Sequence, residues 1–200
     1  MTKPTVTTPL LPFRLLGPVV LLALASGASG SVVRVLSLPQ LVERSDVVVV
    51  ASVESAASAW VDGRIVTDVV VVVGEGVAGA AAGGRLIVRT LGGEVDGIGQ
   101  RVFGEPQLRS GERYLLFLET LPSGDASSSA ATALYRAVGM SQGALPVVDA
   151  PGGATVAPNP DLPELVEPGA QMSVRPWLDA SRPLADVLAD VRAALPAAGN

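Results

Sequence analysis

The clearest hydrophobic pattern in the chain is the segment 64–73, which ends in five consecutive valines. Side chains branched at Cβ restrict χ1 and favour extended backbone, so the segment predicts a β-strand. Its polar residues Arg64, Thr67 and Asp68 lie in the first half, whereas both faces of the second half are apolar. We therefore expect a strand that enters a covered or closed sheet.

Strand patterns also occur on both sides of this segment. Residues 47–53 are almost wholly apolar and precede an Asp62-Gly63 turn, which predicts an antiparallel hairpin with 64–73. Residues 55–63 are expected to form the wide, partly irregular end of that hairpin. Later strands are expected at 85–91, 112–118 and 134–138.

Two helices are expected, one before and one after these strands. Ser37 can cap a short helix that has a proline in its first turn and Gln40 at the capping-box position. A second helix is expected at 181–196, capped by Asp179 or Ser181. Its apolar residues recur at helical spacing and should cover the sheet: Leu184, Val187, Leu188, Val191 and Leu195.

The first 25 residues predict export. Lys3 and Arg14 precede an apolar run at 15–25, and Ala23 and Ala25 offer an Ala-x-Ala cleavage site. This order is typical of a secretory signal peptide, and the run is short for a membrane span. We expect cleavage, no membrane span in the mature chain, and a secreted or periplasmic location; retention as an uncleaved anchor is the alternative.

The composition narrows the possible chemistry. The chain contains no cysteine and no histidine, which excludes disulfides, thiolate chemistry, imidazole catalysis and the usual zinc sites. A net charge of -5 provides no basic surface for nucleic acid. We expect no enzyme activity and no cofactor.

Two glycine motifs resemble functional motifs but lack the required context. Residues 74–79 match G-x-G-x-x-G, yet the next strand follows too soon for a crossover helix, so a flexible connection is expected. Residues 139–143 match G-x-S-x-G around Ser141, but a serine nucleophile needs a base. The mature chain would contain neither histidine nor lysine, so we expect Ser141 to be structural.

One pattern carries a family resemblance: Ser-Leu at 37–38, Leu-Val at 41–42, Ser-Asp-Val-Val-Val at 45–49, Val53, Trp60, Gly-Arg-Ile at 63–65, and Thr67. It resembles a large group of uncharacterised bacterial secreted proteins, over most of the mature chain as far as Gly143. The resemblance implies a small barrel similar to the OB-like barrel of netrin-like and metalloproteinase-inhibitor domains. Those inhibitors chelate zinc through an amino-terminal cysteine, a mechanism that this chain, without cysteine, does not share.

The fold class expected is mainly β, a small antiparallel OB-like barrel or curved sheet with a short N-terminal helix and a C-terminal amphipathic helix. Six prolines and little periodicity predict a linker-like extension after the sheet, docked by Trp177 and Leu178. The expected parts are a signal peptide at 1–25, a β-barrel domain at 31–149, the proline-rich extension at 150–180, and the helix at 181–196.

The function expected is that of a non-catalytic module that binds or inhibits a macromolecule, either an unknown protein or an envelope polymer. Candidate binding residues are the aromatic side chains of two long loops, Trp60 in 55–63 and Phe103 in 92–106. The alternative role for both is to close an end of the barrel. The alternative functions are an architectural envelope protein and a hydrolase that uses carboxylates alone.

Acidic residues of the second loop are further candidates. Glu94 and Asp96 are included among the binding residues, and with Glu105 they could surround a cation. Their spacing matches no calcium-binding loop, so we expect solvated acids and no metal site.

Overall fold

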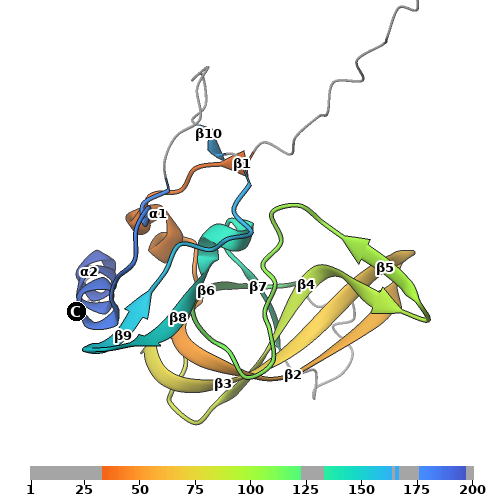
Figure 1. Cartoon of the computed structure of the whole chain (residues 1–200), viewed down its shortest axis with the longest axis horizontal. Helices are drawn as coiled ribbons and strands as arrows, with labels where there is room; N and C mark the ends of the chain where they lie inside the picture. Colours follow the sequence, from red (N-terminus) through yellow and green to blue (C-terminus); the bar gives the residue numbers. More distant parts are fainter. Residues whose placement is uncertain (1–32, 123–132, 164, 167–175, 197–200) are drawn as a thin grey trace, which may run out of the picture.

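The computed structural model describes residues 33–122, 133–163, 165–166 and 176–196. The expected signal peptide lies outside the described residues. The described chain folds into one large, mainly antiparallel sheet, a small sheet of two parallel strands and two α-helices (Figure 1). A mainly β fold with a short N-terminal helix and a C-terminal helix is thereby confirmed.

The elements follow one another along the described chain in this order: β1 (Val33–Arg34), α1 (Leu38–Glu43), β2 (Val47–Val61), β3 (Arg64–Ala78), β4 (Arg85–Val95), β5 (Ile98–Arg101), β6 (Arg113–Thr120), β7 (Leu134–Ala137), a 3-10 helix (Met140–Gly143), β8 (Ala144–Ala150), β9 (Gly153–Val156), β10 (Leu165–Val166), β11 (Arg182–Pro183) and α2 (Leu184–Ala194).

The large sheet curves back on itself. Its strand order is β11-β9-β8-β6-β2-β3-β4-β5, and β7 pairs both with β6, antiparallel, and with β4, parallel. Strands β2, β3, β4, β7 and β6 therefore form a circuit of hydrogen-bonded neighbours. The contact between β4 and β7 is short, with two residue pairs, Ile87 with Leu134 and Val88 with Tyr135.

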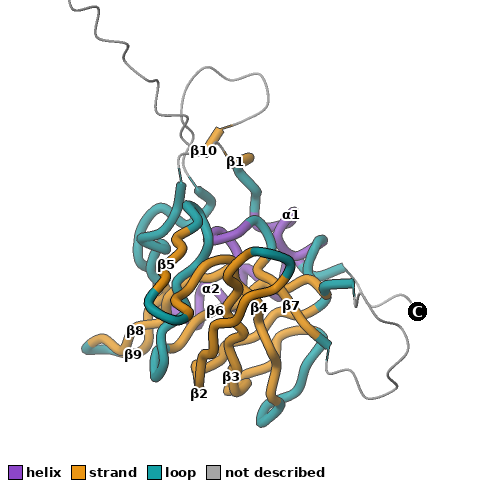
Figure 2. Tube along the Cα trace, turned by 90° about the vertical axis from the view of Figure 1, so that its right-hand side faces the viewer, coloured by secondary structure: helices purple, strands orange, loops and turns teal. Residues whose placement is uncertain are grey.

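Two apolar cores lie on opposite faces of this curved sheet. Along β2, Val47, Val49 and Val53 point into an inner core enclosed by the circuit, whereas Val48 and Val50 point into an outer core beneath the helices. Successive side chains of a strand alternate between faces, so a strand covered on both faces is apolar throughout. The helices lie at the left in Figure 1 and behind the strands in Figure 2.

The local signals for α1 are confirmed. The Ser37 side chain accepts a hydrogen bond from the backbone N–H of Gln40, and the Gln40 side chain accepts one from the Ser37 N–H. Both halves of the capping box are therefore present. The backbone N–H groups of Ser37 and Gln40, at the start of the helix, therefore both have side-chain partners from within four residues of sequence.

The apolar stripe of α2 is confirmed, but its expected cap is wrong. Val187, Leu188 and Val191 are buried in the outer core. The N-cap residue is Pro183, with no side-chain cap, because the preceding residues pair with β9 as strand β11. The chain thus passes directly from a strand into the helix, and Asp179 and Ser181 precede that strand.

The hairpin end is more regular than expected. Strand β2 continues to Val61 and pairs with β3 down to the turn at Asp62 and Gly63, whose φ angles of 49° and 73° suit a type I′ turn. A register shift between Val53 and Ser55 is accommodated without ending the strand. The serines and alanines that follow have little strand preference of their own, and pairing with the valine-rich β3 holds them extended.

The expected flexible connection at 74–79 is also wrong, because β3 extends to Ala78. Glycine is needed there for close backbone approach. A Cβ on Gly76 would lie 2.0 Å from the carbonyl oxygen of Ala80, and one on Gly79 would lie 2.1 Å from that of Asp46. The motif therefore lies at the end of a strand, and no helix begins there.

The proline-rich extension is docked as expected. Leu178 is buried in the outer core, and the Trp177 ring meets Phe117 edge-on, with ring centroids 6.4 Å apart. Linker character fails for 153–156, which form strand β9 against β8. The turn Pro151-Gly152 connects the two strands of this hairpin, and the sequence pattern alone did not show it.

Candidate functional site

Residues 92–106 do not form the long loop that was expected. Strand β4 pairs with β3 as far as Leu91, then bends at Gly92 and Gly93 and pairs with β5 instead. The φ angles of these glycines, 94° and 132°, are unfavourable for other residues. Residues 92–101 thus form a two-stranded ribbon, here called the β4–β5 ribbon, which projects at the right in Figure 1.

The ribbon lies directly on the β2–β3 hairpin. A Cβ on Gly93 would lie 2.4 Å from both the Ser58 Oγ and the Thr67 Oγ1. Those two hydroxyl oxygens are 2.9 Å apart, and Thr67 donates a hydrogen bond of 2.7 Å to the carbonyl of Gly92. The absence of a side chain at Gly93 is therefore what allows the ribbon to approach the hairpin.

Longer-range hydrogen bonds fix the ribbon further. The Gln100 Oε1 accepts from the Ile65 N–H at 3.0 Å, where β4 has left the edge of β3. The Gln100 side chain thus takes the place of β4 as the hydrogen-bond partner of the Ile65 N–H. The Asp161 carboxylate binds the Arg101 guanidinium and the Gln107 N–H, each at 3.2 Å. Hydrogen bonds thus anchor the ribbon to two separate segments of the chain, β3 and the segment around Asp161.

An open pocket of about 390 Å³ lies along this ribbon. Its lining consists of two glycines and of residues that carry a carboxylate, a guanidinium and two amides. The lining residues are Gly93, Glu94, Gly99, Gln100, Arg101 and Gln107. Two apolar side chains of the same segment are exposed, Ile98 at 55% and Phe103 at 73%. We call the set Glu94, Ile98, Gln100, Arg101, Phe103 and Gln107 the ribbon surface.

The candidates from the sequence fall in different places. Glu94 lines the pocket, Asp96 stands in the ribbon turn with φ 52°, and Phe103 follows β5. Trp60 lies on β2, 49% exposed, where its cross-strand neighbour Ile65 donates to Gln100. Gln100, Arg101 and Gln107 were not identified from the sequence, since exposed amides and arginines carry no pattern; the Gly92-Gly93 pair could have indicated the bend.

The three acids considered as cation ligands do not converge. Within the described residues, no group of three acidic side chains is placed to hold a metal ion. Glu105 is instead partly buried and accepts a hydrogen bond of 3.1 Å from the Leu91 N–H. Burial raises the pKa of its carboxyl group above the ordinary value.

Ser141 is fully buried in the 3-10 helix. Its hydroxyl group lies 2.5 Å from the carbonyl oxygen of Gly104 and 3.2 Å from that of Asp161. Neither acceptor is a base that could take the proton of a nucleophile. The Ser141 hydroxyl therefore contacts both Gly104, in the segment that follows the ribbon, and Asp161, in the segment that anchors the ribbon.

We predict that a fluorophosphonate, which labels activated serines, will leave Ser141 unmodified. The hydroxyl is buried and bound to carbonyl oxygens, so it has neither access to the reagent nor an activating base. Intact mass after incubation measures the outcome, with a serine hydrolase as the positive control. Stoichiometric labelling at Ser141 would contradict this structural role.

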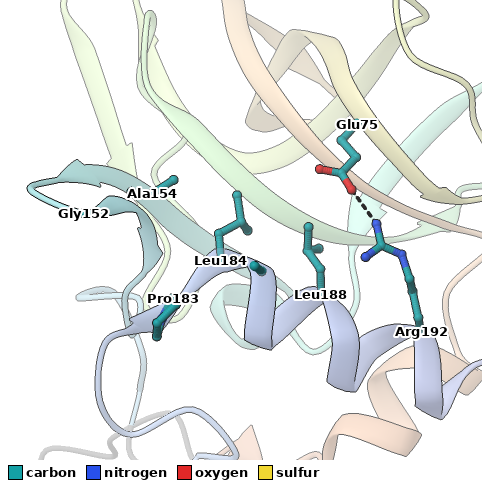
Figure 3. A pocket seen from close by; sticks show the side chains of 9 residues that line it. Glu75, Gly152, Ala154, Pro183, Leu184, Leu188 and Arg192 are labelled. Atoms are coloured by element: carbon teal, nitrogen blue, oxygen red, sulfur yellow. Dashed lines mark hydrogen bonds and ion pairs between the residues drawn. The ribbon is translucent and has the colours of Figure 1, made fainter.

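A second pocket, of about 400 Å³, lies between α2, β9 and β3 (Figure 3). Its charged residues are Glu75 and Arg192, and they form an ion pair with each other at 2.5 Å. The remaining lining consists of glycine, alanine, proline and leucine residues. This pocket therefore offers a ligand fewer available polar groups than the ribbon surface.

Comparisons with known proteins complete the description. A scan against protein-family models found no match, and neither did searches of the curated proteins and of the solved structures. In the described part of the chain, neither helix has the length and apolar character needed to cross a membrane.

Proposed function

We propose that the mature chain is an exported, non-catalytic module that binds another macromolecule in the cell envelope or extracellular space through the ribbon surface. The observation that carries the proposal is Phe103, a large aromatic side chain that is 73% exposed beside an anchored ribbon. Aromatic residues dominate the binding energy of many interfaces, and function concentrates on segments that a rigid scaffold positions.

Other features support parts of this proposal. Export rests on the charged start, apolar run and Ala-x-Ala site of residues 1–25. An OB-like arrangement is supported by the circuit of five strands, with one parallel pair, since the OB-fold is a partly open five-stranded barrel. A non-catalytic role is supported by the burial of Ser141 and the lack of histidine and cysteine.

The ribbon surface also indicates what kind of partner it fits. Phe103 and Ile98 offer apolar contact, while Glu94, Gln100 and Arg101 offer a carboxylate, an amide and a guanidinium. Part of the Arg101 charge is offset by Asp161, so the pocket is not strongly cationic. A protein surface or an envelope polymer that combines an apolar patch with neutral hydrogen-bonding groups matches this set.

We predict that Phe103→Ala will weaken partner capture by about 30-fold or more, the loss expected for an aromatic anchor worth about 2 kcal/mol. Immobilised protein would be incubated with native envelope extract, and the retained material quantified over a series of protein densities. The thermal melt should barely change, because an exposed ring contributes little to folding.

Val148→Ala provides the matched control. Val148 is 52% exposed on β8, outside the ribbon surface, so its truncation should leave capture unchanged. Equal capture by the Phe103 variant and the unaltered protein would exclude the ribbon surface as the binding site. No specific capture by the unaltered protein would exclude the binding function itself.

A further inference from the structure

Within the described part of the chain, one edge of β2 has no partner strand over the part nearest the hairpin turn. Strand β6 pairs with β2 only over residues 47–52, and the last bonds on that side join Val53 to Gly111 and Glu112 and the Glu54 carbonyl oxygen to the Ser110 hydroxyl. Among the described residues, no backbone group is hydrogen-bonded to this side of residues 55–61. This stretch is here called the β2 edge.

The turn determines which backbone groups of the β2 edge point outward. In a two-residue type I′ hairpin the pair flanking the turn, Val61 with Arg64, is hydrogen-bonded, and the pairs then alternate. Trp60, Ser58 and Ala56 therefore direct their N–H and C=O groups away from β3. The Ile65 N–H agrees with this alternation, because it donates to Gln100 and not to β2.

The β2 edge lacks the features that usually protect an open strand. Residues 55–61 contain no charged residue and no proline, and five of the seven are serine or alanine. Natural proteins discourage pairing at such edges with charges, prolines or bulges. Charged residues flank the stretch at Glu54 and Asp62, and Glu54 is bound by the Nε and Nη2 atoms of Arg85, at 2.9 and 2.8 Å.

We propose that a second copy of this chain pairs with the β2 edge as an antiparallel strand, with the two-fold axis at Ser58. In this register Ser58 lies opposite Ser58, and Ala56 lies opposite Trp60 of the second copy. All three outward-facing residues of each strand are then in hydrogen-bonded pairs, which form six hydrogen bonds between the copies. A two-fold axis makes the contact self-complementary and closed.

The side chains and charges suit this register. The half-exposed ring of Trp60 lies opposite a methyl group, which leaves room for it. On the other face Ala57 lies opposite Ala59, so small side chains meet again. At each end of the seam Glu54 and Arg85 approach Asp62 and Arg64 of the second copy, two acids and two arginines, and no net charge opposes the contact.

The expected dimer is weak. A seam of seven residues on each side is smaller than the standard interface of a stable complex. We therefore expect monomer and dimer to exchange, with the dimer fraction rising as the protein concentration rises. This association uses the β2 edge and is independent of the ribbon surface.

Cysteine pairs test the register directly, because the chain has no cysteine of its own. In the proposed register Ala57 and Ala59 face each other as a non-hydrogen-bonded pair, with Cα atoms about 4.5 Å apart, within disulfide range. A mixture of the A57C and A59C proteins should therefore form a disulfide-linked dimer under mild oxidation. Each variant alone should cross-link far less, because the two identical cysteines would then lie diagonally across the seam, too far apart for a disulfide.

Ala56→Pro tests the hydrogen bonds. The Ala56 N–H points outward, so proline removes an intermolecular donor without breaking the bonds to β3. Sedimentation velocity of the purified chain should show a concentration-dependent dimer that this variant weakens at least tenfold, with circular dichroism unchanged. A monomer at all concentrations, equal cross-linking of mixed and single cysteine samples, or cross-linking to a co-purifying protein instead would each overturn the proposal.

Discussion

Val71→Lys should unfold the protein, whereas Asp68→Lys should leave it folded. Val71 is fully buried in the inner core, between Val53 of β2 and Leu86 of β4. An unpaired charge there costs several kcal/mol, a large part of the roughly 5–15 kcal/mol that separates folded from unfolded domains. Thermal melts and urea titrations of both variants measure the difference.

The matched substitution three residues earlier meets a different environment. The Asp68 side chain is 37% exposed and binds Arg89 through two hydrogen bonds of 2.7 and 2.8 Å. Lysine would lose that pair and face a like charge, a cost of about 1 kcal/mol for a partly solvated pair. If the two lysine variants had the same melting temperature, the assignment of the two faces of β3 would be wrong.

Gln142→Ala should lower the free energy of unfolding by about 2–4 kcal/mol. Only 2% of Gln142 is exposed, and its side chain accepts from the Leu36 N–H at 2.9 Å. It also donates to the carbonyl of Arg34 at 3.0 Å and that of Gly139 at 3.2 Å. Truncation leaves these backbone groups without their partner in a buried setting, which is costlier than losing an exposed bond.

Gln100→Ala supplies the control for this prediction. Gln100 is exposed and its side chain accepts one hydrogen bond, from the Ile65 N–H, so water can replace it and the cost should be about 1 kcal/mol or less. Limited proteolysis gives a second readout, since the Gln142 variant should be cut near residues 33–36. Equal losses of stability for the two variants would contradict the role assigned to Gln142.

Much of the fold followed from local signals in the sequence. Strands β3 and β6 are dominated by branched and other large apolar residues, α1 is specified by Ser37 and Gln40, and α2 by its apolar stripe. Each of these signals acts within one element, through rotamer restriction, capping or helical periodicity. Such effects do not depend on the rest of the fold.

The ribbon and the β2 edge were not foreseen, because they depend on distant partners. Residues 55–61 are extended through pairing with β3, and the serines and alanines in them favour no strand by themselves. The position of the ribbon depends on the hydrogen bond between Gln100 and Ile65, which are 35 residues apart. The segment that follows the ribbon is held by the hydrogen bond from the Ser141 hydroxyl to Gly104, 37 residues apart. Contacts over such separations leave no periodic pattern in the sequence.

The short pairing of β4 with β7 has a consequence for how the fold opens. Two residue pairs close the circuit at this point, whereas β2 and β3 pair along most of their length. The free energy of local opening is lowest where few backbone hydrogen bonds must break together. We therefore expect strand β7 to separate from β4 while the long hairpin stays intact, so that transient opening along this seam admits solvent to the inner core before the chain unfolds globally.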